Sequence, residues 1–175
     1  KKIMYLAGGM AQNYYHQKGN IYRWVFRKTM TMYDIVMCEG EVNVQLVDEI
    51  TNGKTRTFYL PNFTEDGFAP DSLPNKPEEC INIFYFGRID KTKQVLLGVE
   101  IFNRLCEKYD NLRYTIVGGG NEDYDAKVIS AISSSPYKSR IHKFGRSSHK
   151  VLAEMMQIQH IFLFPSNEPC EGHSN

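Results

Sequence analysis

The chain has 175 residues, a hydrophobic fraction of 42% and a formal net charge of +1. This length fits one large domain, or one domain and part of another, and the apolar content excludes an intrinsically disordered chain. The 21 Lys and Arg residues nearly balance the 20 Asp and Glu residues, so no overall charge favours binding to nucleic acid. Any anion site must therefore be local.

The cysteines and the apolar runs exclude several other classes. The four cysteines stand far apart and include no C-x-x-C pair, so the sequence predicts neither a metal site nor a disulfide framework. No apolar run approaches the roughly 18 residues that a membrane helix requires. We therefore expect a cytoplasmic protein with no bound metal.

The first part of the chain predicts helices and strands in alternation, in an order typical of the end of an α/β unit. The predicted helices are residues 20–34 and 41–51, the latter ended by Asn52 and Gly53, and the predicted strands are residues 35–38 and 55–61. Residues 64–79 follow, with three of the seven prolines and no apolar periodicity. They predict a linker.

After the linker the alternation becomes clearer. Strands are predicted at residues 81–87, 112–118, 141–145 and 160–165, with helices at 94–109, at 123–133 and after a cap at Ser147 or Ser148. This order favours an α/β fold with a Rossmann-like parallel sheet and helices on both faces. Right-handed crossovers place the carboxyl ends of the four strands at one edge, where open α/β sheets bind ligands.

The four strand ends carry chemistry that suits a phosphate. They read "GRIDKTK", "GGGNED", "FGRSS" and "PSNEPCEGHSN". Glycines let backbone N–H groups approach an anion, and Arg88 and Lys93 add positive charge. Taken singly, the two cations could be solvated loop charges, and Gly118 to Gly120 could form a simple turn.

Two further residues narrow the choice of ligand. Asp123 stands where the dinucleotide fingerprint G-x-G-x-x-G needs its last glycine, which disfavours a nicotinamide site. Glu171, directly before Gly172, would be repelled by phosphates. Its expected partners are sugar or ribose hydroxyls, and the alternative is a surface charge.

The segments "FGRIDKTK", "YTIVGGG", "IHKFGRSS" and "IFLFPSNEPCEGHSN" resemble, in order and spacing, the donor domain of the retaining GT-B glycosyltransferases of family four (glycosyl transferases group 1). "YLPNF" is similar to the stretch by which those enzymes leave their first domain. The resemblance covers about residues 34–175. It implies three parts: residues 1–63 as the remnant of an N-terminal acceptor-side domain, 64–79 as a linker, and 80–175 as an incomplete C-terminal nucleotide-sugar domain.

The resemblance also implies roles for individual residues. Arg88 and Lys93 would hold the donor diphosphate, although Gln94 follows where the family usually has glycine. Arg88, Lys93 and Glu171 are the implied catalytic residues. The implied donor-binding residues are Gly87, Arg88, Lys93, Gly118, Gly119, Gly120, Phe144, Gly145, Arg146, Glu171, Gly172, His173 and Ser174. "YLAGGM" is similar to a cleft loop of the first domain, but Ala7 stands where a histidine is common.

In the family, the residue that matches Glu171 is the first of two glutamates separated by seven residues. The second glutamate would fall at position 179. We therefore expect this chain to be a fragment that is truncated at both ends and inactive alone. The implied parent transfers a hexose, with retention, from a nucleotide diphosphate sugar, UDP- or GDP-linked, to a glycan or lipid-linked acceptor. Such a reaction would build a polysaccharide or glycolipid without metal or cofactor. The implied location is the cytoplasm at the inner face of the membrane, with membrane contact through the missing N-terminal part. The alternatives are a GT-B nucleotide-sugar epimerase or hydrolase and a non-catalytic binding module.

Overall fold

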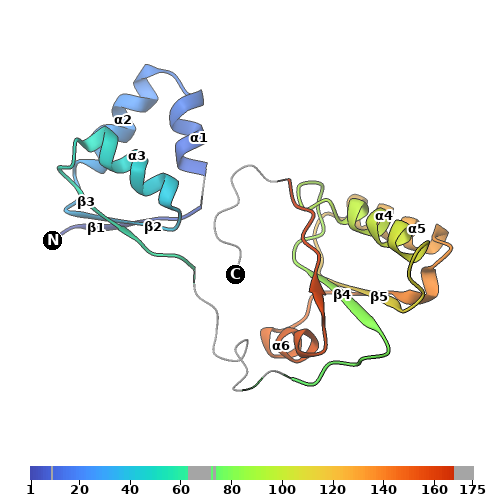
Figure 1. Ribbon diagram of the computed structural model, residues 1–175. Coiled ribbons are helices and arrows are strands. Elements are labelled where there is room, and N and C mark those ends of the chain that lie inside the picture. Colours follow the sequence, from blue (N-terminus) through green and yellow to red (C-terminus); the bar gives the residue numbers. More distant parts are fainter. Residues whose placement is uncertain (9, 63–71, 73, 168–175) are drawn as a thin grey trace. The chain divides into compact units, whose positions relative to one another are not determined.

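The computed structural model describes residues 1–8, 10–62, 72 and 74–167 (Figure 1). These residues form two compact units, one within residues 1–62 and the other within residues 72–167. The units lie on either side of the predicted linker. The roles expected for them, acceptor side and donor side, remain predictions.

The first unit contains a sheet of three parallel strands in the order β1-β2-β3. Its elements are β1 Ile3–Leu6, α1 Met10–Gln17, α2 Asn20–Met30, β2 Ile35–Cys38, α3 Glu41–Thr51 and β3 Arg56–Tyr59. Figure 1 shows the three helices on one side of this sheet. Because strand side chains alternate between faces, Val36 and Cys38 point into the core beneath the helices.

Helix α3 ends as its sequence predicts. Asn52 and Gly53 both adopt left-handed backbone angles, with φ of 52° and 68°, and the Gly53 N–H donates to the carbonyl of Asp48 at 3.1 Å. Strand β1 and helix α1 were absent from the sequence prediction. β1 has only four residues, and α1 is a short helix with few apolar residues, so neither gives a strong periodic signal.

The second unit contains a sheet of four parallel strands in the order β6-β5-β4-β7. Its elements are β4 Ile81–Phe86, α4 Val95–Cys106, β5 Leu112–Val117, α5 Glu122–Ser134, the 3-10 helix η2 Lys138–Arg140, β6 Ile141–Phe144, α6 His149–Gln157 and β7 Ile161–Phe162. The predicted α/β fold with a parallel sheet is confirmed. The last strand, predicted at residues 160–165, is shorter in the structure, at Ile161–Phe162.

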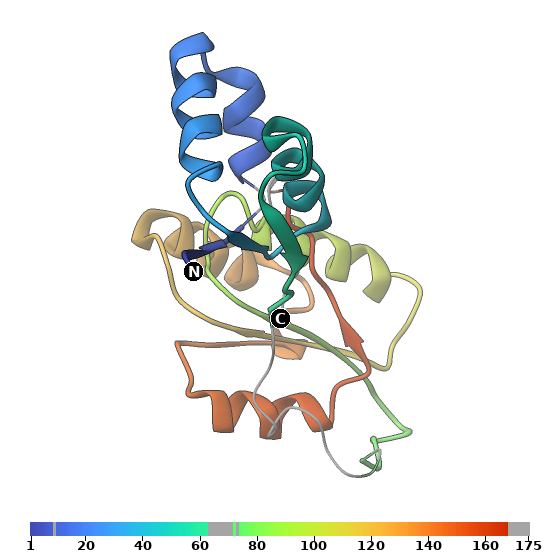
Figure 2. The same cartoon turned by 90° about the vertical axis from the view of Figure 1, so that its left-hand side faces the viewer.

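Helices cover both faces of this second sheet. Tyr85 and Tyr114 point to the face packed by α4 and α5, and their neighbours Phe84 and Val117 point to the face packed by α6. Figure 2 shows α6, in orange, across the sheet from α4 and α5. The burial of each of the three aromatic side chains, Phe84, Tyr85 and Tyr114, contributes on the order of 1.5–3 kcal/mol to the stability of the folded state.

Two caps fix where helices begin at the carboxyl edge of the second sheet. The side-chain oxygen of Asn121 accepts from the Tyr124 N–H at 2.9 Å, so α5 begins immediately after the glycine loop. The hydroxyl of Ser148 accepts from the Val151 N–H and caps α6. The helices of the described part of the chain are each too short or too polar to traverse a lipid bilayer.

Candidate functional site

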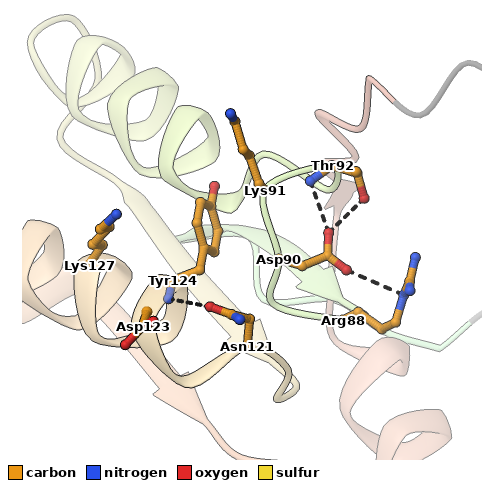
Figure 3. Close-up of a pocket in the computed structure, with 8 residues that line it drawn as sticks. All are labelled: Arg88, Asp90, Lys91, Thr92, Asn121, Asp123, Tyr124 and Lys127. Carbon is orange, nitrogen blue, oxygen red and sulfur yellow. Dashed lines mark hydrogen bonds and ion pairs between the residues drawn. The ribbon is translucent and has the colours of Figure 1, made fainter.

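The loop after β4 is shaped by one carboxylate, Asp90. An oxygen of Asp90 accepts from the Thr92 N–H at 3.0 Å, the Thr92 hydroxyl at 2.7 Å and the Lys93 N–H at 3.1 Å (Figure 3). This is an Asx turn, in which a side chain replaces a backbone acceptor. The turn sets the path of the chain from Arg88 to Lys93.

Arg88 lies on the outside of this turn. Its backbone carbonyl accepts from the buried Tyr85 hydroxyl at 2.7 Å, which holds the main chain at this point. Its side chain is 64% exposed, and its Nε lies 3.5 Å from the Asp90 carboxylate. The guanidinium therefore extends from a fixed backbone toward solvent, where an anion could reach it.

Opposing effects act on the pKa of Asp90. Partial burial raises it, but the hydrogen bonds from Thr92 and Lys93 and the positive charge of Arg88 outweigh burial, and the pKa is lowered. The carboxylate therefore stays ionised at neutral pH and keeps accepting the bonds that shape the loop.

Lys93 occupies a different environment from Arg88. It is only 8% exposed, and its Nζ lies 5.3 Å from the centre of the Phe164 ring. The chain beyond β7 joins the same loop, since the Asn167 N–H donates to the carbonyl of Thr92 at 3.0 Å. The loops after β4 and β7 are thus linked at this edge of the sheet.

The glycines of the loop after β5 are explained by close contact between backbones. Gly118 has a φ of 151°, and a Cβ there would overlap the carbonyl oxygen of Gly87. A Cβ on Gly120 would overlap the carbonyl oxygen of Ile89, with which Gly120 forms a parallel bridge. Only glycine fits at these two positions, so the simple-turn explanation is insufficient.

Five of the predicted donor-binding residues share one hollow of about 250 Å³ at the carboxyl edge of the sheet. These are Gly87, Arg88, Gly118, Gly119 and Arg146. Phe86, Val117, Ser147 and Leu152 complete the lining. The hollow thus combines glycine backbone, two guanidinium groups and an apolar floor, a composition that suits a nucleotide with its phosphates.

A second hollow of about 560 Å³ lies on the side of α5, and Arg88 also lines it. Its lining is polar and of mixed charge, as Figure 3 shows, and consists of Arg88, Asp90, Lys91, Thr92, Asn121, Asp123, Tyr124 and Lys127. The Tyr124 hydroxyl accepts from the Leu96 N–H at 3.3 Å, which ties α5 to the first turn of α4.

The other predicted site residues do not line the smaller hollow. Lys93 is buried, and the backbone of Gly120 packs against the backbone of Ile89. Phe144 and Gly145 line a separate hollow of about 260 Å³ beside α5. Glu171, Gly172, His173 and Ser174 lie outside the described residues.

Sequence reasoning missed Asp90, Ser147 and Leu152. An Asp two residues before Thr92 is an Asx-turn signal that could have identified Asp90. Ser147 and Leu152 gave no signal of a site, because their types are common on helices and at helix starts. Within residues 1–8, 10–62, 72 and 74–167, no group of three or more His, Cys, Asp or Glu side chains could hold a metal ion.

Solved structures share the fold of this chain at low identity. The pneumococcal O-GlcNAc transferase GtfA, solved with UDP and GlcNAc, is 18% identical with a TM-score of 0.68, over 89% of this chain and 29% of that chain. TarM of S. aureus is 13% identical with a TM-score of 0.68, over 99% and 33%. The E. coli trehalose-6-phosphate structure bound to UDP-2-fluoro glucose is 14% identical with a TM-score of 0.69, over 98% and 48%.

The chain therefore spans less than half the length of these structural relatives. A comparison with curated proteins finds no match. The model of one protein family, described as "Glycosyl transferases group 1", matches residues 72–174, which is more than half of the chain. This chain belongs to the glycosyl transferases group 1 family and has the α/β fold of GT-B glycosyltransferases.

Proposed function

We propose that the whole protein is a retaining glycosyltransferase that moves a hexose from a nucleoside diphosphate sugar to an acceptor hydroxyl. The observation that carries this proposal is the convergence of Gly87, Gly118 and Gly119 with Arg88 and Arg146 around one hollow. The hollow lies at the carboxyl edge of a parallel sheet, where α/β proteins bind nucleotides. Membership of the family supports the same reaction.

The chemistry requires charge to be stabilised on the leaving group. The bond from the anomeric carbon to the diphosphate oxygen breaks, and its electron pair departs with the diphosphate. The acceptor oxygen forms the new bond on the same face and passes its proton to an oxygen of the departing diphosphate. Arg88 binds the diphosphate and stabilises this charge, and such a donor typically lowers the barrier by about 2.7–4 kcal/mol.

Lys93 provides a second positive charge under the loop. Its low exposure keeps water away from the ammonium, which strengthens its attraction for a nearby phosphate. Following the family resemblance, Glu171 contacts the donor sugar, and the backbone of Gly172 to Ser174 contacts sugar and phosphate. Arg146 and the backbone of Phe144 and Gly145 meet the base.

We propose that transfer needs neither metal nor cofactor, because Arg88 and Lys93 supply the positive charge that a metal would otherwise provide. The donor is UDP- or GDP-linked. UDP is the first choice, since the pneumococcal GtfA structure contains UDP and the E. coli structure contains UDP-2-fluoro glucose. Activity that persists in EDTA is the expected result, and activity that returns only with Mg²⁺ or Mn²⁺ would contradict this part of the proposal.

The decisive test is transfer by the whole protein with Arg88→Ala, compared with Arg113→Ala. Arg113 is an exposed arginine near the amino end of β5, away from the hollow, and serves as the matched control. We expect Arg88→Ala to remove most transfer without unfolding the protein and Arg113→Ala to retain it. Near-normal transfer by Arg88→Ala would contradict the assigned role.

Product analysis separates this proposal from its rivals. Incubation with UDP- and GDP-sugars and a panel of acceptors should yield a new glycoside with the donor's anomeric configuration. An epimeric nucleotide sugar or free sugar, formed without acceptor, would identify an epimerase or hydrolase. Binding of nucleotide sugar without turnover would identify a binding module.

We propose that the acceptor is a glycan or lipid-linked sugar destined for a polysaccharide or glycolipid, and that α2 contributes to contact with the inner face of an anionic membrane. Ile21, Trp24 and Val25 follow helical spacing and are 82%, 62% and 48% exposed. Residues 1–33 contain six Lys and Arg and no acidic residue. An exposed apolar stripe beside cations suits an anionic lipid surface.

Vesicle sedimentation tests the membrane contact. The whole protein should sediment with vesicles of phosphatidylglycerol and phosphatidylcholine more than with phosphatidylcholine alone, and Trp24→Ala should reduce this binding. Leu97→Ala removes another exposed apolar side chain, 40% exposed, from α4 in the second unit and should leave the binding unchanged. Equal sedimentation of all three proteins, or none, would contradict the contact.

A further inference from the structure

The carboxyl edge of the first sheet carries a polar cluster that the proposed donor site does not include. It is formed by the loop after β1, the end of β2, the first turn of α3 and the chain after β3. Its members are Gly8, Glu39, Asn43 and Asn62. Since ligands of α/β sheets bind at this edge, the purpose of the cluster bears on function.

Glu39 is central to the cluster. It is only 8% exposed, yet its carboxylate accepts from the Gly8 N–H at 2.5 Å and from the Asn62 side-chain amide at 2.6 Å. Both partners are neutral donors. A buried carboxylate is costly unless it is hydrogen-bonded, so a residue of this type is expected only where two donors must be held together.

Asn43 holds the peptide group on the other side of the Gly8 Cα. Its side-chain amide donates to the Gly8 carbonyl at 2.5 Å, and it is fully buried in the first turn of α3. The N–H and the C=O of Gly8 are therefore both fixed by buried side chains. Asn62 extends the network, because its amide oxygen accepts from the Tyr5 hydroxyl at 3.4 Å.

The described residues leave the opposite side of Gly8 uncovered. Gly8 has a φ of 72°, and among the described residues a Cβ built there would meet no atom within 4 Å. Its glycine is thus required by the backbone angle and not by crowding within the protein. A backbone that is held by buried side chains on one side, and left uncovered on the other, presents its polar groups to a ligand in a fixed conformation.

We propose that Glu39 is a positioning residue that holds the backbone of Gly8 in the conformation that receives the acceptor hydroxyl. It acts through Gly8 and touches no substrate itself. This inference rests on the proposed transferase function.

Glu39→Gln tests the proposal because an amide cannot accept from both neighbours. With Asn62 oriented as it is, one of the two hydrogen bonds must be lost. In the whole protein we expect kcat/KM for the acceptor to fall about 10- to 100-fold, as for loss of a hydrogen bond to a charged group. The Kd for UDP should change less than about 2-fold, because the donor site is on the other unit.

A reciprocal change distinguishes positioning from a general structural role. Asn62→Asp, added to Glu39→Gln, presents acceptor oxygens to the new amide and restores both bonds with donor and acceptor exchanged. The double variant should recover most of the lost acceptor kcat/KM. Glu49→Gln, at an exposed position of α3 away from the cluster, is the matched control and should behave as wild type.

Amide hydrogen exchange gives a readout that does not depend on catalysis. Peptides containing Gly8 should exchange at least about 10-fold faster in Glu39→Gln, while those from the second half of α3 stay unchanged. If the double variant restores slow exchange but the wild-type protein transfers no sugar, the role of Glu39 in holding Gly8 is supported and the proposed function is contradicted. Unchanged exchange and acceptor kinetics in Glu39→Gln would overturn the inference.

Asn62→Ala provides the same test if Glu39→Gln does not fold. Asn62 lies at an exposed position, so its truncation leaves the core intact while Glu39 loses one donor. We expect the same direction of change in acceptor kinetics and exchange, with a smaller size. Wild-type values for both would overturn the proposal.

Discussion

The two sheets hold the loops at their carboxyl edges by different means. After β1, the buried side chains of Glu39 and Asn43 hold the backbone of Gly8. After β5, Gly118 and Gly120 press directly against the backbone of Gly87 and Ile89. The first loop should therefore tolerate an added methyl group better than the second, and this difference can be measured.

The largest expected effect is at the second sheet. In Gly118→Ala the new Cβ collides with the Gly87 carbonyl, and the φ of 151° disfavours any side chain. Because neither backbone can move without breaking the sheet, we expect a loss of more than about 3 kcal/mol of unfolding free energy. Urea unfolding followed by circular dichroism measures it. Gly145→Ala, with no neighbour within 4 Å, is the control.

The corresponding change at the first sheet should cost less. Gly8→Ala introduces a methyl group into open space, so only the φ of 72° opposes it. The expected loss is about 1–2 kcal/mol, the usual cost of a left-handed residue with a Cβ. A loss equal to that of Gly118→Ala, by the same unfolding measurement, would contradict the distinction between the two loops.

Gln94 occupies a third position whose backbone angle favours glycine. Gln94 has a φ of 50° at the start of α4, at the place where the resembled family usually has glycine. Gln94→Gly should raise stability by about 0.5–1 kcal/mol by relieving this backbone angle. Gln45→Gly, in the helical interior of α3, should lower it by a similar amount, and two changes of the same sign would contradict the explanation.

The smallest effect concerns Asp90 and pH. Its folded-state pKa lies below the ordinary value of 3.8, so its ionised form stabilises the folded state above that pH. The contribution is lost as pH falls from 3.8 through the lowered pKa. The stability difference between wild type and Asp90→Asn should therefore shrink over this acid range, as pH-dependent thermal unfolding can show. A difference that grows on acidification would reverse the assigned sign.

Sequence periodicity predicted the parallel sheet of the second unit and most helices, because buried strands and amphipathic helices leave strong patterns. The predicted strand order also placed Arg88 and the glycines at the carboxyl edge of the second sheet. Periodicity could not predict that Lys93 is buried with its Nζ over the Phe164 ring, nor that Glu39 contacts Gly8, 31 positions away, because such contacts depend on how distant segments pack. Asp90 shows the intermediate case, where a local turn signal existed and was overlooked.

The account depends most on the claim that Arg88 binds a diphosphate. Titration calorimetry of the whole protein with UDP and with UMP, for wild type, Arg88→Ala and Arg113→Ala, tests this claim directly. We predict that Arg88→Ala weakens UDP binding about 10- to 100-fold and leaves UMP binding nearly unchanged, while Arg113→Ala alters neither. Equal losses for UDP and UMP, or no loss for UDP, would contradict the claim.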